Sequence, residues 1–189
     1  MALSSHAQFT EGTFLLSGKT GLGFSASGSK IKSDGDAQKI GNTMAITFTP
    51  AMGYFFSDNF AAGLSLNLDY SSGEELFFGE EATINSVSFT GGPFIRQYFA
   101  KGFFLEGALA AGVQYEKYDF GGGDTDFRNL VYGWSLSAGY AAMVNKMFAI
   151  ESGIGYGVYT YKGDLEDEVK LVNYGLAITI GVALYLNRE

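Results

Sequence analysis

The C-terminal part of the chain alternates strictly between bulky apolar residues and small or polar ones. The bulky set is Val172, Tyr174, Leu176, Ile178, Ile180, Val182, Leu184 and Leu186, and the intervening set is Asn173, Gly175, Ala177, Thr179, Gly181, Ala183 and Tyr185. Successive residues of a strand point to opposite faces, so this segment predicts one long strand with a bulky apolar face. Other segments repeat the pattern, with charged residues on the small-residue face. The pattern favours a closed barrel whose apolar outside meets lipid and whose small, polar face lines the interior.

The composition is consistent with a single β-domain in a lipid environment. Of the 189 residues, 47% are hydrophobic, 16% are aromatic and only 17% are charged. The 27 glycines disfavour long helices, and no apolar run approaches the roughly 20 residues that a membrane helix needs. The net charge of -8 argues against a nucleic-acid partner. Because the chain contains no cysteine, disulfides and thiol chemistry are excluded.

Short turns and longer polar stretches divide the chain into alternating segments. The turns lie at 57–59, 100–102 and 145–147, and the polar stretches at 28–41, 71–81, 121–126 and 163–168. The segments between them predict eight strands, near residues 13–27, 43–56, 60–70, 82–99, 103–118, 127–144, 148–162 and 169–187. Short turns at one end and long loops at the other are typical of transmembrane barrels. We therefore predict an all-β, eight-stranded antiparallel up-and-down transmembrane β-barrel, with both termini on the short-turn, periplasmic side.

The first eight residues are distinct from the strand pattern. The segment Ala2–Gln8 is similar to the small-residue end of a secretory signal, with cleavage expected after Ala7, although the charged and hydrophobic parts of such a signal are missing. We interpret residues 1–8 as a signal-peptide remnant or a disordered tail. The transmembrane β-barrel domain is then expected over residues 9–189.

Four charged residues fall on the predicted inner face near the short turns. Arg96 and Glu106 flank the second turn at equal distances from Lys101, Glu151 lies at a similar height beyond the third turn, and inner-face parity adds Lys19. Because an unpaired buried ion is very costly, we predict that these four side chains form an ion-pair network in the lumen. Two interpretations stay open: a structural plug, or an electrostatic gate in which an exchange of partners opens a narrow water path.

The predicted loops contain most of the remaining charge and one apolar patch. Leu76, Phe77 and Phe78 interrupt an acidic stretch, where they form either a strand extension or an adhesive tip for a surface partner. The acidic clusters do not match the spacing of a calcium loop, so no metal or cofactor is predicted. The sole histidine is His6, outside the predicted barrel, so we expect no catalytic residues and no enzymatic activity.

Taken together, these features resemble the small eight-stranded outer-membrane β-barrel family that includes OmpA-, OmpX- and Ail-like proteins. The resemblance rests on the strand number, the asymmetry of turns and loops, glycine-rich steps at Gly21–Gly23 and Gly153–Gly157, and the closing strand that ends at Leu186. Members often end in an aromatic residue, whereas this chain ends in Asn187–Glu189. The resemblance implies a monomer in the bacterial outer membrane, in contact with its lipids and with lipopolysaccharide.

The expected function is structural or interactive rather than catalytic. We expect a packed polar lumen and a role in envelope integrity or adhesion, exerted through the external loops. One alternative is a narrow, low-conductance pore. Another is a soluble, lipocalin-like carrier of small molecules, whose bulky apolar residues would instead face inward; the assignment of faces argues against it.

Overall fold

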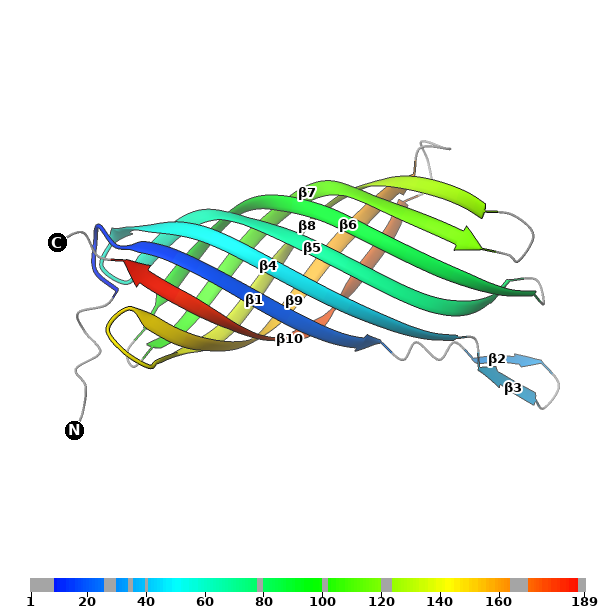
Figure 1. Cartoon of the computed structure of the whole chain (residues 1–189), viewed down its shortest axis with the longest axis horizontal. Helices are drawn as coiled ribbons and strands as arrows, with labels where there is room; N and C mark the ends of the chain where they lie inside the picture. Colours follow the sequence, from blue (N-terminus) through cyan, green and yellow to red (C-terminus); the bar gives the residue numbers. More distant parts are fainter. Residues whose placement is uncertain are drawn as a thin grey trace.

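The computed structural model describes residues 9–25, 30–33, 36–39, 41–77, 80–99, 102–119, 124–163 and 170–186. Its main body is a closed antiparallel barrel of eight strands, in the order β1-β10-β9-β8-β7-β6-β5-β4 (Figure 1). The strands are β1 (Phe14–Ser25), β4 (Gly41–Ser57), β5 (Phe60–Phe77), β6 (Glu80–Tyr98), β7 (Phe103–Asp119), β8 (Asp124–Met143), β9 (Phe148–Gly163) and β10 (Lys170–Leu186). The predicted up-and-down barrel is therefore confirmed.

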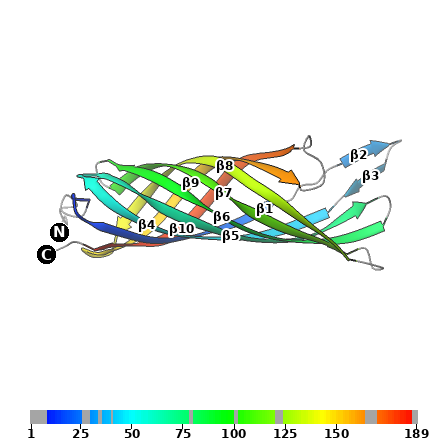
Figure 2. The same ribbon diagram turned by 90° about the horizontal axis from the view of Figure 1, so that it is seen from above.

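The two ends of the barrel differ in how the strands are connected. Short connections join β4 to β5, β6 to β7 and β8 to β9 at one end, where β1 also begins and β10 also ends (Figures 1 and 2). We call this the turn end and the opposite end the loop end. A separate hairpin of β2 (Lys30–Ser33) and β3 (Asp36–Lys39) lies between β1 and β4 at the loop end. Residues 1–8, expected to be a signal remnant or tail, lie outside the described residues.

The largest difference from the predicted strand bounds lies at the loop end. β5 and β6 remain paired as far as Phe77 and Glu80, so most of the predicted loop at 71–81 is a strand hairpin. The start of β8 at Asp124 likewise falls within the predicted loop at 121–126. Backbone pairing does not require apolar side chains, so strands that continue into a polar environment lose the alternation that revealed them.

Large apolar side chains cover the outside of the barrel. They are exposed on every barrel strand, as on β5, where Leu64, Leu66 and Leu68 point outward, while their neighbours Ser65 and Asn67 point inward. A continuous apolar band of this kind is not stable in water, but it matches the hydrocarbon of a bilayer. Its orientation contradicts the lipocalin-like alternative, in which these side chains would line the interior. No helix in the described part of the chain is long and apolar enough to span a bilayer.

Candidate functional site: a plugged lumen below an open chamber

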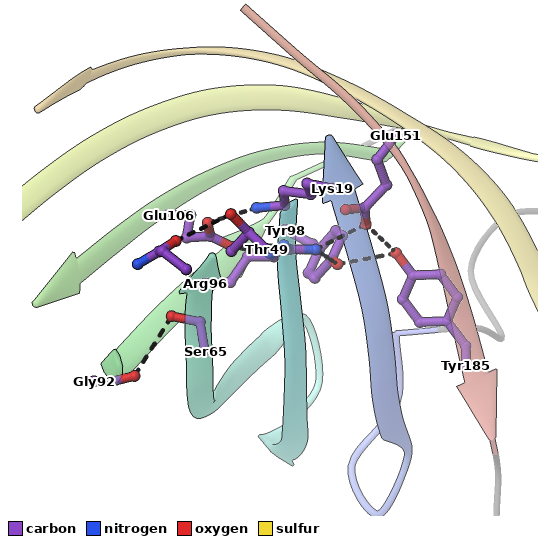
Figure 3. A network of polar contacts seen from close by, with 10 residues as sticks. Lys19, Thr49, Ser65, Gly92, Arg96, Tyr98, Glu106, Glu151 and Tyr185 are labelled. Atoms are coloured by element: carbon purple, nitrogen blue, oxygen red, sulfur yellow. Dashed lines mark hydrogen bonds and ion pairs between the residues drawn. The ribbon is translucent and has the colours of Figure 1, made fainter. Parts of the chain in front are cut away.

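The lumen brings together the four charged residues that the sequence singles out. Lys19 comes from β1, Arg96 from β6, Glu106 from β7 and Glu151 from β9, and all four project into the barrel interior (Figure 3). Arg96 and Glu106 lie directly opposite each other in the register of β6 and β7. The other two residues lie on strands that are not adjacent to this pair, and they reach it across the barrel.

Arg96 is at the centre of the network. Its Nε donates to Glu106 Oε2 at 2.7 Å, and its Nη1 donates to Glu151 Oε1, also at 2.7 Å. Lys19 Nζ donates to Glu106 Oε1 at 2.6 Å, so both oxygens of that carboxylate accept from cations. The Arg96 side chain is 0% exposed and Glu151 is 2% exposed. Two cations against two anions leave the network neutral, which is the condition for burying four charges in a narrow lumen.

Two tyrosines extend the ionic network toward the turn end. Arg96 Nη1 also donates to Tyr98 Oη at 2.8 Å, and Tyr185 Oη donates to Glu151 Oε1 at 3.0 Å. The hydroxyls of Tyr98 and Tyr185 lie 3.0 Å apart and are hydrogen-bonded to each other. Both side chains are buried. The charged groups therefore have partners on the side that faces the turn end as well as among themselves.

An aromatic layer fills the lumen between this network and the turn end. Phe9 stacks on Tyr98 with ring centroids 4.1 Å apart and makes an edge contact with Tyr185 at 5.3 Å. Phe55 packs against the same rings. Phe104 lies under the guanidinium of Arg96, at 4.4 Å from its ring centroid, in a cation–π contact. We call these five aromatic residues and the four charged residues the plug.

Hydrogen bonds hold the segment before β1 against the turn end of the barrel. Asn59 N–H donates to the Phe9 carbonyl at 2.6 Å, and Gly12 N–H donates to the Phe55 carbonyl at 3.0 Å. Glu11 N–H donates to Asp58 Oδ1 at 3.0 Å. These bonds tie the segment to the turn between β4 and β5, and so hold the Phe9 ring inside the lumen.

A chamber of about 560 Å³ lies above the plug, toward the loop end. Lys19 and Glu106 belong both to its floor and to the plug, and their side chains are 13% and 14% exposed. Its wall includes hydroxyl and amide groups, with Thr49 Oγ1 donating to Asn67 Oδ1 and Asn67 Nδ2 donating to Thr90 Oγ1, beside the rings of Tyr159 and Tyr161. Near the turn end the lumen is thus filled by aromatic rings and paired charges. Toward the loop end it is open.

The sequence did not single out the aromatic part of the plug. Alternation does place Tyr185 on the inner face, but a pattern of small residues inside gives no reason to expect a cluster of rings there. The cluster of rings forms because four strands and the segment before β1 each supply one ring at the same level along the barrel axis. The apolar patch is only partly described: Leu76 and Phe77 lie at the end of β5, nothing is described of their side chains, and Phe78 lies outside the described residues.

Comparisons with known proteins find similarity only at the level of structure. No family model matches the chain, and no curated protein sequence matches it. Among solved structures, the outer membrane protein OprG from Pseudomonas aeruginosa is 17% identical, with a TM-score of 0.46, over 95% of this chain and 98% of that one. The outer membrane protein Ail of Yersinia pestis is 19% identical, with a TM-score of 0.47, over 93% and 99%. Neisserial surface protein A is 14% identical, with a TM-score of 0.46, over 92% and 97%.

Since these identities are all below 20%, the assignment depends on the barrel itself. The sheet closes on itself, large apolar side chains cover its outer surface, and the charged residues Lys19, Arg96, Glu106 and Glu151 lie inside. These are the three conditions that a sheet must meet in hydrocarbon. The chain is an eight-stranded transmembrane β-barrel.

Proposed function

We propose that this protein is a non-conducting barrel that acts in envelope integrity or surface interaction through its loop end. The observation that supports this proposal most is the burial of Arg96, which lies between two carboxylates and above the aromatic layer at 0% exposure. A side chain held in this way blocks the centre of the lumen. An eight-stranded lumen is narrow enough for a few side chains to fill it at one level, which favours the same interpretation.

The plug is best suited to a structural role because its four charges pair with one another. Removing one ion would leave its partner buried and unpaired, so opening the lumen would require several bonds to break together. Interaction would then be restricted to the loop end, where β5 and β6 form a hairpin and the sequence contains the apolar segment Leu76, Phe77 and Phe78. We propose this segment as the contact for a surface partner, with outer-membrane lipids and lipopolysaccharide surrounding the barrel wall and a single chain as the functional unit.

Electrical recording tests the non-conducting proposal directly. The purified protein is inserted into planar bilayers, and insertion is verified by protease protection. We expect no discrete openings from the native chain. Repeated unitary openings would overturn the proposal and favour the narrow pore.

The pore is the second candidate because Glu106 accepts from both Lys19 and Arg96. A carboxylate shared in this way could change partners, and Lys19 and Glu106 are the plug residues that reach the chamber. If openings occur, the variant Glu106→Lys should change their conductance, because it reverses a charge on the path.

Cell assays test the surface role. A strain without the protein is complemented either with the native chain or with Leu76→Ser/Phe77→Ser/Phe78→Ser. We expect the triple variant to lose adhesion while it restores resistance to detergent as the native chain does. As a matched control, Glu74→Gln/Glu75→Gln changes neighbouring residues and retains the apolar patch. Unchanged adhesion by the triple variant, at equal surface abundance, would remove the segment from the proposal.

A further inference from the structure

Strands β1 and β10, which close the barrel, are paired over only part of their length. Their pairing runs from the turn end up to Gly21↔Thr179. Beyond this point Leu22–Ser25 remain paired with β4, and β10 remains paired with β9. Among the described residues, Leu22–Ser25 therefore have no partner on β10, and the two strands separate toward the loop end (Figure 1). We call the opening between β1 and β10 above Gly21↔Thr179 the seam.

The exposure of β10 is consistent with a missing neighbour at the seam. On its lipid face, Tyr174 and Leu176 are each 74% exposed, whereas Leu184, in the paired part of the strand, is 40% exposed. On its inner face, Gly175 and Ala177 are exposed as well. A methyl group added at Gly175 would meet no atom within 4 Å. Both faces of β10 are therefore accessible along the seam.

The seam connects the chamber with the outside of the barrel. The residues that line the chamber include Asn173, Gly175 and Ala177 from the unpaired part of β10. They also include Thr47 on β4 and Asp69 on β5, which belong to the wall on the other side of β1. A molecule in the chamber could therefore extend sideways between β1 and β10 without passing the loops.

The height of the seam places it against the outer leaflet. A strand tilted by about 40° climbs roughly 2.5 Å per residue. Thr179 lies seven positions before Leu186, the last residue of β10, so the seam begins roughly 18 Å above the turn end of that strand. The apolar band of such a barrel is about 25 Å tall. The seam thus starts in the upper part of the hydrocarbon and continues to the level of the lipid headgroups.

An open strand edge at this depth requires a polar partner. The backbone N–H and C=O groups along the seam would otherwise face hydrocarbon, where no water can satisfy them. An apolar occupant cannot supply hydrogen bonds to this edge. A molecule with a polar head next to the edge can, and an acyl tail attached to the head would lie in the bilayer beside the apolar outer face of β10.

The charge of the chamber restricts the kind of head that fits. Its walls are rich in hydroxyl and amide groups, and its charged residues are Lys19, Asp69 and Glu106. Glu106 is neutralised by Lys19 and Arg96. In the described part of the chain no ion pair involves Asp69, which accepts a hydrogen bond from Thr47. Among the described residues the Asp69 carboxylate thus has no counter-ion, which favours an ammonium or hydroxyl donor over a purely anionic head.

We propose that the chamber and the seam bind an amphiphile of the outer leaflet, with a donor-bearing polar head next to Asp69 and an acyl tail that leaves between β1 and β10. This proposal does not depend on whether the plug conducts, because the site lies above the plug. It assigns a ligand to the lumen, whereas the proposed function concerns the loops and the closed base.

Cross-linking tests the seam itself, and the absence of native cysteine makes the readout clean. Gly23→Cys/Ala177→Cys occupies positions that would be opposite each other if the β1–β10 register continued. Ser17→Cys/Ala183→Cys is the control, because these two residues are paired. In folded protein under mild oxidation, we expect the control to form a disulfide and the seam pair to remain reduced. Equal cross-linking of both pairs would show that the wall is closed and would overturn the proposal.

Fluorescence quenching tests the ligand. A bimane label is placed at Ala177→Cys or at Ile154→Cys, a lipid-facing position on the paired wall of β9. The probe is lysophosphatidylethanolamine with a brominated acyl chain, added to the protein in phosphatidylcholine bilayers. We expect saturable quenching at Ala177→Cys, and at Ile154→Cys only quenching proportional to the probe in the bilayer. Proportional quenching at both positions would overturn the proposal.

Competition and one variant identify which part of the probe is recognised. Unlabelled lysophosphatidylethanolamine should compete, whereas glycerophosphoethanolamine, which has the head but no tail, should not. Palmitate, whose anionic head has no ammonium or hydroxyl donor, should compete about tenfold more weakly, and Asp69→Asn should weaken binding by about tenfold, as expected for one charge-assisted hydrogen bond. Asp126→Asn, which removes an exposed carboxylate that does not line the chamber, is the matched control and should bind the probe as the native chain does. Equal competition by the head alone, or unchanged binding in Asp69→Asn, would contradict an amphiphile held at this carboxylate.

Discussion

The two halves of the lumen are made by the same strands but have opposite characters. In the turn half, charges are paired, rings are stacked and β1 is paired with β10. In the loop half, the same wall encloses an open chamber, and the β1–β10 pairing has ended. In the turn half the polar side chains bond to one another. In the loop half many of them face the open chamber, where they are available to a ligand.

The difference shows that the closure of a small barrel is not a property of its strand number alone. The same eight strands build the turn half, where β1 and β10 are paired, and the loop half, where they are not, and the side chains that line the two halves differ as well. The turn half is closed by the nine large side chains of the plug, whereas the loop half leaves a chamber between glycine, serine, threonine, asparagine and tyrosine residues. Stability and binding are therefore expected to separate along the barrel axis, and substitutions at matched positions can test that separation.

The largest effect is expected from Arg96→Ala in the turn half. The substitution leaves Glu106 and Glu151 buried without their shared cation, which should cost about 3–5 kcal/mol of folding free energy. The double variant Arg96→Ala/Glu106→Ala should cost less than the sum of the two single variants. The measurement is urea-induced unfolding in lipid vesicles. Strict additivity would mean that the two residues are not coupled.

Two valines on the lipid face of β10 allow the outer surfaces of the two halves to be compared. Val182→Arg places a charge near the middle of the apolar band and should cost roughly 2–4 kcal/mol, whereas Val172→Arg, near the loop end, should cost about 0–1 kcal/mol. The two native side chains are similarly exposed, at 47% and 50%. Folding yields and unfolding free energies in vesicles give the comparison. Equal costs would show that the seam lies as deep in the bilayer as the paired part of β10.

The contribution of the aromatic layer to stability can be tested at Phe9. Phe9→Ala removes a buried side chain and should lower stability by about 1.5–3 kcal/mol. Phe14→Ala removes the same group from the outer face, where the ring is 45% exposed and meets lipid, so its effect should be smaller. Thermal unfolding followed by the gel mobility of the folded form distinguishes the two. A larger effect for Phe14→Ala would contradict the packing of Phe9 inside the lumen.

The smallest effect is expected in the chamber. Asn67→Ala removes hydrogen bonds to Thr49 and Thr90, but water in the open chamber can replace them, so the cost should be about 0.5–1.5 kcal/mol. The same vesicle unfolding assay as for Arg96→Ala applies. A cost as large as that of Arg96→Ala would remove the distinction between a dry half and a wet half.

Much of the architecture could be predicted from the sequence, because alternation depends on lipid contact. The eight strands follow from it, and so does the inner-face parity of Lys19, Arg96, Glu106 and Glu151. The sequence predicts that Lys19 joins the network but does not specify Glu106 as its partner, because this ion pair joins β1 to β7 across the barrel. The height at which distant strands meet depends on tilt and stagger, which one sequence does not specify.

Two other features could not be predicted from the sequence, for different physical reasons. The extension of β5 and β6 into the polar stretch at 71–81 leaves no apolar alternation to detect. The seam was equally hidden, since Gly175 and Ala177 continue the pattern of β10 without interruption whether or not β1 is paired with them. Pairing between the first and last strands is the contact of greatest sequence separation, and no local signal reports where it stops.

Tyr185 gives the plug a consequence for the order of assembly. Its hydroxyl joins Tyr98 of β6 and Glu151 of β9, yet the residue itself belongs to β10, the final strand of the barrel. Until that strand arrives, the guanidinium and carboxylates contributed earlier lack one of their neighbours and must stay hydrated. We therefore expect the docking of β10 on β1 to be the step that excludes water from the turn end of the lumen and makes insertion difficult to reverse.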